Sequence, residues 1–332
     1  MSEVQQLKAK DFKSSQEVRW CPGCGDYSII SSVQNVLADL GRDKDNVVMV
    51  SGIGCSSRFP YYMDTYGFHG IHGRANAIAT GVKVANPDLD TWVITGDGDG
   101  LSIGGNHMIH SLRRNVSLKI ILFNNEIYGL TKGQYSPTTP QGQRTKTTPF
   151  GSVDAPFNPL QLALGAGATF VARTLDVRPK HMKEVLKAAA EHKGAAFVEV
   201  WQNCVIFNDG AFKAWADKKV RDDQTVDLIP GQPMVFGAEK EKGLKAEGCH
   251  IAVVSADEAS IWDPTLDSAG PAFLMTQLDR DPSMPRPFGV FRQVQAPTLD
   301  ELIHEQITEV TDKQGPGRLK DLIYTPDAWE VK

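Results

Sequence analysis

The stretch TWVITGDGDG, residues 91–100, gives the clearest indication of the fold class, because an apolar run ends there in a segment of glycines and aspartates. A continuous apolar run closed by glycines is typical of a buried strand in a parallel sheet. Runs of this kind alternate along the chain with segments in which apolar residues recur every three or four positions, as in helices. The alternation predicts right-handed crossovers and an α/β fold with a doubly wound parallel sheet. In such sheets, ligands bind at the carboxyl ends of the strands.

The predicted elements lie in the N-terminal part of the chain. Strands are expected at residues 46–54, 91–100, 118–125, 169–174 and 195–201, and helices at 26–40, 75–87, 106–115, 159–167 and 181–194. Asp26 is expected to cap the first helix. The polar residues 132–152, rich in proline and glycine, predict a lid or a partner contact. Periodicity fades after Lys219, so residues 1–225 are expected to form one domain. Residues 226–332 are expected to form a C-terminal extension that packs on the core and on a partner.

The composition is that of an ordinary globular protein, with 41% hydrophobic and 23% charged residues in a chain of 332. The net charge of -5 and the pI of about 5.9 disfavour nucleic-acid binding, which favours a basic face. The longest apolar runs are too short to cross a bilayer, and the polar N-terminal residues do not resemble a signal peptide. We therefore expect a cytoplasmic protein with no nucleic-acid or membrane partner, in a compartment where disulfides are rare.

Two polar segments at the ends of consecutive predicted strands form an informative pair. Gly96-Asp97-Gly98 is followed, after 25 intervening residues, by Asn124-Asn125. A carboxylate and an amide oxygen on adjacent strand ends are ligands that Mg²⁺ prefers, and a glycine lets a phosphate approach the backbone. A calcium loop starting at Asp97 is excluded, because its twelfth position is Met108 and not glutamate. The pair predicts a site for Mg²⁺ and a diphosphate.

With this spacing the sequence resembles the thiamin-diphosphate enzymes, whose motif joins GDG to NN at this distance. The resemblance implies that Asp97, the side chain of Asn125 and the carbonyl group of Ile127 bind Mg²⁺. It also implies that thiamin diphosphate is bound by thirteen residues. These are Gly54, Cys55, Ser56, His72, Gly73, Asp97, Gly98, Asp99, Asn125, Ile127, Gly129, Leu130 and Thr131.

Four cysteines lie near the ends of predicted elements: Cys21 and Cys24 precede the first helix, and Cys55 and Cys204 each follow a strand. The odd total of five cysteines and the expected cytoplasmic location disfavour disulfides. A structural zinc site normally needs a second short knuckle, which is missing, and a redox dithiol would leave two of the cysteines unexplained. Four thiolates at one edge fit a [4Fe–4S] cluster, whose ligands need proximity in space and not in sequence. Cys249 lies outside this region and is expected to be a buried, inert thiol.

Both features together resemble the β subunit of the 2-oxoacid:ferredoxin oxidoreductases. The resemblance covers about residues 17–215 and rests on WCPGCG, GIGCSS, HGRANAIATG, GDGDG, NNEIYGLTKGQYSPTT and the late cysteine. The segments TYGFHGIHGRA and GGNHMIHSLRRN look most like the 2-oxoglutarate type. The resemblance implies that residues 1–225 bind thiamin diphosphate and a [4Fe–4S] cluster. It also implies that Cys21, Cys24, Cys55 and Cys204 hold that cluster.

The activity implied by the resemblance is CoA-dependent oxidative decarboxylation of 2-oxoglutarate to succinyl-CoA and CO₂. It proceeds through a thiamin adduct, and electrons pass singly through the cluster to ferredoxin. The family keeps the glutamate that activates thiamin in a separate subunit, so an α partner is implied, in a dimer of αβ heterodimers. Pyruvate or a branched-chain 2-oxoacid is an alternative substrate. A non-redox thiamin lyase or carboligase with structural zinc, and a non-catalytic metal-binding scaffold, are alternatives from other classes.

His72 and Arg74 are candidate catalytic residues, because they follow a glycine-rich loop and could reach the reacting carboxylate or the diphosphate. The alternative interpretation is that both side chains only tie the loop. Lys119 is expected at the edge of a strand, exposed to solvent.

Overall fold

The computed structural model describes residues 7–325, 327–329 and 331. Its centre is an eight-stranded sheet with the order β2-β1-β3-β4-β6-β5-β11-β7. The first six strands in this order run parallel, whereas β11 pairs antiparallel with β5. The strands are β1 (Val47–Ser51), β2 (Tyr66–His69), β3 (Asp90–Gly96), β4 (Leu118–Asn124), β5 (Phe170–Leu175), β6 (Ala196–Trp201), β7 (Thr225–Leu228) and β11 (Arg286–Gln293).

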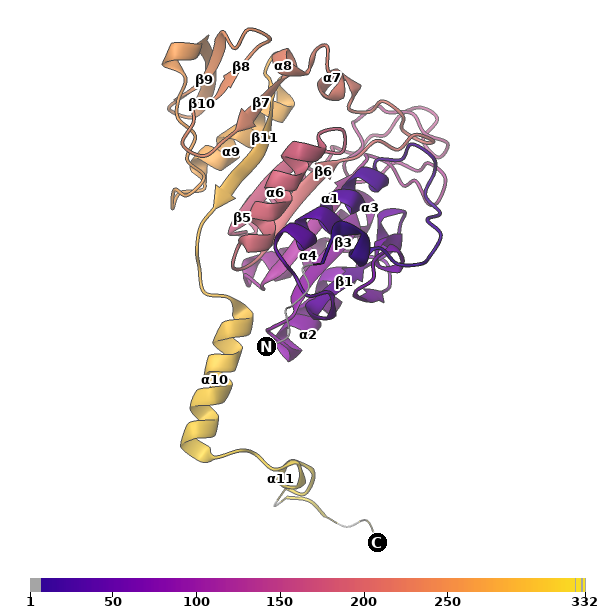
Figure 1. Cartoon of the computed structure of the whole chain (residues 1–332), viewed down its shortest axis with the longest axis vertical. Helices are drawn as coiled ribbons and strands as arrows, with labels where there is room; N and C mark the ends of the chain where they lie inside the picture. The colour runs from indigo at the N-terminus through magenta and orange to yellow at the C-terminus, as the bar shows by residue number, and fades with distance from the viewer. Residues whose placement is uncertain (1–6, 326, 330, 332) are drawn as a thin grey trace.

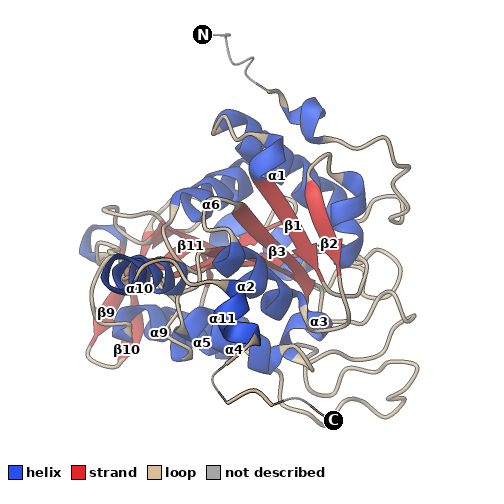
Figure 2. Cartoon of the chain, turned by 90° about the horizontal axis from the view of Figure 1, so that it is seen from below, coloured by secondary structure: helices blue, strands red, loops and turns tan. Residues whose placement is uncertain are grey.

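The sheet is covered by helices on both faces, which explains why its central strands are apolar along their whole length. Every residue of β1 and of β4 is buried, as expected of parallel strands between two helical layers. Figure 2 shows the two layers on either side of the sheet. The prediction of an α/β fold is confirmed. Helices α1 (Asp26–Asp39) and α6 (Pro179–Glu191) cover one face, and α2 (Ala75–Ala85), α4 (Gly105–Arg113), α5 (Pro159–Gly165) and α9 (Gly270–Gln277) cover the other.

Four parallel strands end at one edge of the sheet. The register aligns the last residue of β1 with Ile94 of β3, Gly96 of β3 with Phe123 of β4, and the last residues of β4 and β6 with each other. Beyond these ends, the chain forms two short helices, η3 (Ser56–Tyr62) and α3 (Asp97–Leu101), and a long loop that connects β4 to α5. The acidic glycine segment after β3 is therefore the beginning of a helical turn. This edge is where the chemistry-bearing segments gather.

The C-terminal part of the chain contributes more to the core than its weak periodicity indicates. Strands β7 and β11 extend the main sheet beyond β5. A separate antiparallel sheet is formed by β8 (Val235–Phe236), β9 (Lys242–Glu247) and β10 (His250–Ser255). The expected division between residues 225 and 226 falls inside β7 and stays a prediction, but the residues C-terminal to it are partly core.

The last two helices, α10 (Leu299–Gln314) and α11 (Leu319–Ile323), extend away from the body of the molecule (Figure 1). Within the described part of the chain, no helix combines the length and the apolar character needed to cross a membrane. Short helical turns complete the structure: η1 (Ala9–Phe12), η2 (Lys44–Asn46), α7 (Lys213–Ala216), α8 (Arg221–Gln224), η4 (Ala256–Glu258) and η5 (Leu278–Arg280).

Three predictions for single side chains are wrong. Lys119 is only 5% exposed, because β4 lies between β3 and β6, and its ammonium group donates to the carbonyl oxygen of His192. Cys249 is exposed in the turn between β9 and β10 and is not a buried thiol. Asp26 is the first residue of α1, whose cap is Gly25. The side chain of Asp26 is therefore free for another role.

Candidate functional site

A cavity of about 450 Å³ opens at the ends of β1, β3 and β4. Its walls come from the loops that carry GIGCSS, GDGDG and NNEIYG. Twelve of the thirteen predicted cofactor-binding residues line it, and Gly73 does not. The twelve are Gly54, Cys55, Ser56, His72, Asp97, Gly98, Asp99, Asn125, Ile127, Gly129, Leu130 and Thr131.

Asp97 begins α3, and its side chain is 2% exposed at the wall of this cavity. Its Oδ2 atom accepts hydrogen bonds from the hydroxyl groups of Ser136 and Thr138, the latter at 2.7 Å. Burial raises the pKa of Asp97 to about 6, because removal from water disfavours the ionised form. A divalent cation beside the carboxylate would oppose this shift, since a nearby positive charge favours the ionised form.

Asn125 is held in one orientation at the same cavity. Its Nδ2 atom donates to Oε1 of Gln202 at 2.8 Å, and its Oδ1 atom accepts from the backbone nitrogen of Ile127 at 3.2 Å. An amide oxygen has two lone pairs, so Oδ1 can accept this bond and also bind a cation. Together with the Asp97 carboxylate and the carbonyl group of Ile127, it offers the oxygen ligands that suit Mg²⁺. The residues present therefore fit the metal implied by the sequence.

Asp99 braces the loops around the cavity. Its Oδ1 atom accepts from the backbone nitrogens of Gly73 at 2.6 Å and Ile53 at 3.0 Å, and its Oδ2 atom accepts from the hydroxyl of Thr95 at 2.6 Å. Nδ1 of His72 lies 2.9 Å from the same Oδ1 atom. One buried carboxylate thus ties the loops after β1 and β2 to the end of β3. Gly73 thus contacts a residue of the cavity wall although it does not line the cavity itself.

The two candidate catalytic residues occupy different positions. His72 lines the cavity and is partly exposed, and its Nδ1 atom contacts the carboxylate of Asp99. Arg74 does not line the cavity, and its guanidinium group donates to the carbonyl oxygen of His72 at 2.8 Å. Arg74 therefore ties the loop, whereas His72 remains a candidate for contact with a bound group.

Gly98 leaves no room for a side chain. A Cβ atom here would lie 2.2 Å from Cε1 of Tyr128, whose hydroxyl donates to the carbonyl oxygen of Gly98 at 3.0 Å. We expect Gly98→Ala to displace the Tyr128 ring and to weaken thiamin diphosphate binding by about tenfold or more, as measured by titration calorimetry. The matched control is Gly105→Ala at the start of α4, where open space surrounds the new Cβ. Equal weakening in both variants would contradict this role for Gly98.

A second cavity, of about 300 Å³, adjoins the first, and all four predicted cluster ligands line it. Cys21 and Cys24 come from the loop before α1, Cys55 from the loop after β1, and Cys204 from the loop after β6. The fold thus collects four cysteines that lie far apart in the sequence. The residues that line both cavities are Asp26, Cys55, Asn125, Gly129, Leu130 and Gln202.

The four thiols line a cavity and do not converge on the position of a single metal ion. In the described ranges of the chain, no three His, Cys, Asp or Glu side chains converge closely enough to hold one metal ion. A Cβ atom on Gly129 would lie 3.5 Å from Sγ of Cys204 and 3.7 Å from Sγ of Cys55, so the glycine keeps the space between these thiols clear. The five cysteines are free of disulfides. Separated thiols around a cavity suit a polynuclear cluster better than a single zinc ion.

Burial controls the charge of these thiols. Removal from water raises the pKa of Cys55 to about 12 and raises that of Cys24 further, and the nearby Asp26 carboxylate adds to both shifts. Asp26 is 1% exposed, and its Oδ2 atom has no hydrogen-bond partner. Buried polar atoms are normally paired. The neutral thiols fit a bound group whose iron would draw them into the thiolate form.

Several side chains that support the site were not identified from the sequence, among them Asp26, Ser136, Thr138 and Gln202. Ser136 and Thr138 belong to the loop that was expected to be a lid or a partner contact, yet both are buried against Asp97. Their signal was present in QYSPTT, which places one serine and two threonines in the same motif as NN. Gln202 precedes Cys204 by two positions, but nothing in its local pattern indicates that it lines both cavities.

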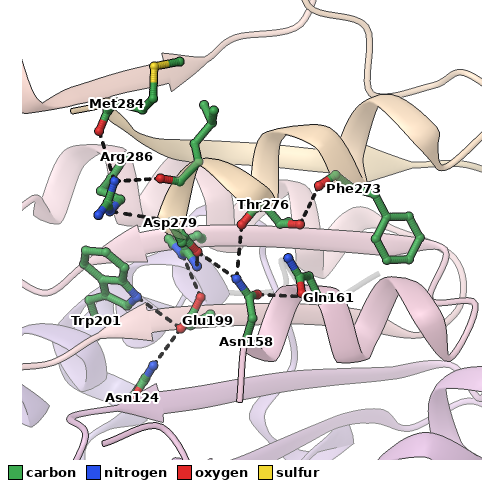
Figure 3. Close-up of polar contacts among 12 residues, drawn as sticks. Asn124, Asn158, Gln161, Glu199, Trp201, Phe273, Thr276, Asp279, Met284 and Arg286 are labelled. Carbon is green, nitrogen blue, oxygen red and sulfur yellow. Dashed lines mark hydrogen bonds and ion pairs between the residues drawn. The ribbon is translucent and has the colours of Figure 1, made fainter. Parts of the chain in front are cut away.

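A buried polar network continues from Asp97 into the sheet. The hydroxyl of Thr138 donates to Oδ1 of Asn124 at 2.9 Å as well as contacting Asp97. Nδ2 of Asn124 donates to Oε1 of Glu199 on β6 at 2.7 Å. Figure 3 shows this Asn124–Glu199 contact and, beside Glu199, the carboxylate of Asp279. The position of the Asp97 carboxylate at the cofactor cavity therefore depends on Thr138, Asn124 and Glu199, of which the last two also connect β4 to β6.

Arg173 neutralises this network. It is 1% exposed, its Nε atom donates to Glu199 at 2.7 Å, and its two terminal nitrogens donate to Asp279 at 2.8 and 2.7 Å. We expect Arg173→Met to lower the free energy of unfolding by about 3–5 kcal/mol, because the fully buried carboxylate of Glu199 loses its cation, whereas the partly exposed carboxylate of Asp279 keeps Arg286 at 4.0 Å. Denaturant titration measures this change. Lys313→Met, which breaks an exposed pair with Glu309, should cost less than about 1 kcal/mol; a comparable loss there would refute the assignment.

Known proteins resemble this chain along most of its length. Residues 52–200 match the family model for the thiamine pyrophosphate enzyme, C-terminal TPP binding domain. The 2-oxoglutarate oxidoreductase subunit KorB of Mycobacterium tuberculosis is 51% identical over 334 residues, covering 98% of this chain and 89% of the relative. The 2-oxoacid:ferredoxin oxidoreductase subunit beta of Saccharolobus solfataricus is 47% identical over 230 residues, covering 68% of this chain and 75% of the relative.

A solved structure supports the same relationship. The 2-oxoglutarate:ferredoxin oxidoreductase from Magnetococcus marinus, with 2-oxoglutarate, coenzyme A and succinyl-CoA bound, matches with a TM-score of 0.76 at 36% identity. The match covers 97% of this chain and 96% of that chain, so it includes both the cavity-bearing sheet and the C-terminal part.

Proposed function

The chain belongs to the β subunits of the 2-oxoacid:ferredoxin oxidoreductases, and on that premise we propose that it serves a 2-oxoglutarate:ferredoxin oxidoreductase. The reaction is the CoA-dependent oxidative decarboxylation of 2-oxoglutarate to succinyl-CoA and CO₂, with two electrons passing to ferredoxin. The names of the M. tuberculosis relative and of the M. marinus structure support 2-oxoglutarate as the substrate. One observation carries the proposal: the cavity lined by the GDG residues and Asn125 and the cavity lined by four cysteines share a wall.

The first cavity is proposed to hold thiamin diphosphate through Mg²⁺. Bound there, thiamin diphosphate supplies the electron sink that lets a 2-oxoacid lose CO₂. The chain's own side chains keep the metal ligands in place: Ser136 and Thr138 orient Asp97, and Gln202 orients Asn125. His72, braced by its contact with a buried carboxylate, is positioned to meet the diphosphate or the substrate carboxylate.

The second cavity is proposed to hold a [4Fe–4S] cluster bound by Cys21, Cys24, Cys55 and Cys204. Cys55 and Gly129 line both cavities, so one layer of residues separates the two cofactors. Electrons released in the first cavity would leave singly through the second. Thiols that must stay free for iron persist in a reducing compartment, so we place the protein in the cytoplasm.

An α subunit is proposed to complete the thiamin site, in a dimer of αβ heterodimers, with ferredoxin as a further partner. The segment that leads to His72 carries the exposed apolar side chains Tyr66, Phe68 and Ile71. Exposed apolar side chains that gather beside a binding site mark a contact surface. A partner that covers this segment could supply the carboxylic acid that activates thiamin.

Substrate choice tests the proposal. The chain is co-purified with its α partner under anaerobic conditions, and viologen reduction is followed with CoA and 2-oxoglutarate, pyruvate or a branched-chain 2-oxoacid. We expect the largest kcat/KM with 2-oxoglutarate. A preference for pyruvate would reassign the substrate within the family. A colourless protein that contains zinc and reduces no viologen would favour the non-redox lyase instead.

A further inference from the structure

We propose that Gln202 is a positioning residue that couples the two cofactor cavities: one end of its amide orients the magnesium ligand Asn125, and the other end tunes the cluster ligand Cys24. This inference rests on the proposed function. Gln202 is 2% exposed and lies just beyond the end of β6. It lines both cavities, so a single side chain is placed between the two proposed cofactors.

The contacts of Gln202 connect the two sites. Its Oε1 atom accepts from Nδ2 of Asn125 at 2.8 Å. Its Nε2 atom donates to Sγ of Cys24 at 3.3 Å and to the carbonyl oxygen of Asn203 at 2.6 Å. Its backbone nitrogen donates to the carbonyl oxygen of Asn124 at 2.8 Å, which fixes the residue to β4. Every polar atom of the amide is therefore used.

The donors and acceptors allow only one orientation of the two amides. A flipped Gln202 would place its oxygen against the carbonyl oxygen of Asn203, which can only accept a hydrogen bond. A flipped Asn125 would set its oxygen against Oε1 of Gln202 and its NH₂ group against the backbone N–H of Ile127. The arrangement thus fixes which end of the Asn125 amide carries the oxygen.

The backbone of Gly25 packs closely against the side chain of Gln202. A Cβ atom on Gly25 would lie 2.9 Å from Cγ of Gln202 and 2.0 Å from the carboxylate of Asp176. The absence of a side chain at this position lets the start of α1, and with it Cys24, reach the end of β6. Gly25 also donates its backbone N–H to the carbonyl oxygen of Asn203 at 3.3 Å. The glycine in WCPGCG therefore has a definite role in bringing the thiol to the glutamine.

A hydrogen bond to a cluster sulfur stabilises the reduced state more than the oxidised state, because the reduced cluster carries more negative charge on its sulfurs. Such bonds are among the features that set the potential of iron–sulfur clusters. The Nε2–Sγ contact is thus expected to raise the reduction potential. An electron acceptor with a higher potential next to the first cavity would favour the departure of electrons from it.

Two variants distinguish the effect of the Gln202 contact with Asn125 from that of its contact with Cys24. Gln202→Leu removes both contacts, so we expect a lower cluster potential and an increase of about tenfold in the Mg²⁺ concentration needed for half-maximal thiamin diphosphate binding. Gln202→Glu keeps an oxygen for Asn125 but has no N–H for Cys24, so we expect the lower potential with a nearly unchanged Mg²⁺ requirement. Both readouts use the αβ complex purified anaerobically. The potential comes from an EPR-monitored redox titration, and binding comes from equilibrium dialysis.

The matched control is Gln161→Leu on α5, a half-buried glutamine that lines neither cavity. It should leave the potential and the Mg²⁺ requirement at their wild-type values. Wild-type values in both Gln202 variants, with cluster and thiamin fully loaded, would overturn this inference alone. A wild-type complex that holds neither cofactor would overturn the proposed function and this inference with it. A variant that loses stability but keeps both readouts would reduce Gln202 to a packing role.

Discussion

Asp97→Asn is expected to abolish the retention of thiamin diphosphate while leaving the protein folded. The substitution keeps the shape of the side chain and an oxygen for the hydroxyls of Ser136 and Thr138, but it removes the only charge among the proposed Mg²⁺ ligands. Losing a buried charged ligand weakens binding by about 3–5 kcal/mol, which is a loss of about 100-fold or more in affinity. Equilibrium dialysis with Mg²⁺ measures this loss.

The stability of the same variant separates a lost ligand from a damaged fold. Burial raises the pKa of Asp97 to about 6, so the unliganded protein gains nothing from holding this carboxylate charged at neutral pH. We therefore expect the unliganded variant to be at least as stable as the wild type. The wild type alone should gain stability on adding Mg²⁺ and thiamin diphosphate, about 2.7 kcal/mol at a ligand concentration 100 times the Kd.

The control for this experiment is Asp312→Asn, an exposed carboxylate on α10. It should retain the ligand-dependent stabilisation. If Asp97→Asn binds thiamin diphosphate as tightly as this control does, the assignment of Asp97 as a metal ligand is wrong.

Cys204→Ser is expected to have the second largest effect: it should lower the iron content of the complex but leave its affinity for thiamin diphosphate nearly unchanged. Cys204 follows β6, whereas the other proposed ligands come from two other loops. Serine offers a harder, less readily ionised ligand, so we expect a deficient cluster and a loss of about 100-fold or more in 2-oxoglutarate-dependent ferredoxin reduction. Thiamin diphosphate affinity should stay within about threefold of the wild type, because the hydrogen bonds that hold Asp97 and Asn125 are made with other residues.

Iron and sulfide analysis of the anaerobically purified complex measures the first effect, and dialysis measures the second. Cys249→Ser serves as the control, because that thiol is exposed between β9 and β10, away from both cavities. Full iron content in Cys204→Ser, or an equal loss in Cys249→Ser, would contradict the proposed ligand set.

The strands and the motifs at their ends could be predicted from the sequence because both are local signals. The runs at 46–54 and 118–125 became β1 and β4, buried along their length, since a parallel strand between two helical layers must be apolar on both faces. Parallel strands place their carboxyl ends at one edge, so the gathering of GIGC, GDG and NN results from topology. For the same reason, Cys55 and Cys204 could be placed together although 148 residues separate them.

The features that escaped prediction depend on contacts between distant segments. Edge strand β2 is exposed at every residue, so it lacks the apolar run of a central strand. Strands β7 and β11 join the sheet from the C-terminal part of the chain, where the sequence shows weak periodicity. Lys119 was misplaced because its burial depends on β6 pairing beside β4 and on the carbonyl oxygen of His192. Side-chain burial of this kind is set by tertiary packing, which local periodicity does not report.

The supporting side chains of the site were missed for a related reason. Ser136 and Thr138 lie in a polar loop without periodicity, and only the folded chain brings them to Asp97. Asp26 has the position of a helix cap in the sequence, but Gly25 occupies that position, and the carboxylate faces the cavities instead. The contacts of these supporting residues with Asp97 and with the cavities are set by tertiary packing, which local sequence patterns do not report.

The thiamin site and the cluster are proposed to be neighbours between which electrons pass. The most direct test adds 2-oxoglutarate alone, without CoA or ferredoxin, to the anaerobic αβ complex and records the EPR spectrum of the cluster. We predict that the reduced-cluster signal appears in the wild-type complex and is absent from Asp97→Asn, even though both hold a full cluster. A wild-type complex loaded with both cofactors that shows no signal with any 2-oxoacid, or an equal signal in Asp97→Asn, would contradict electron transfer from the thiamin site to the cluster.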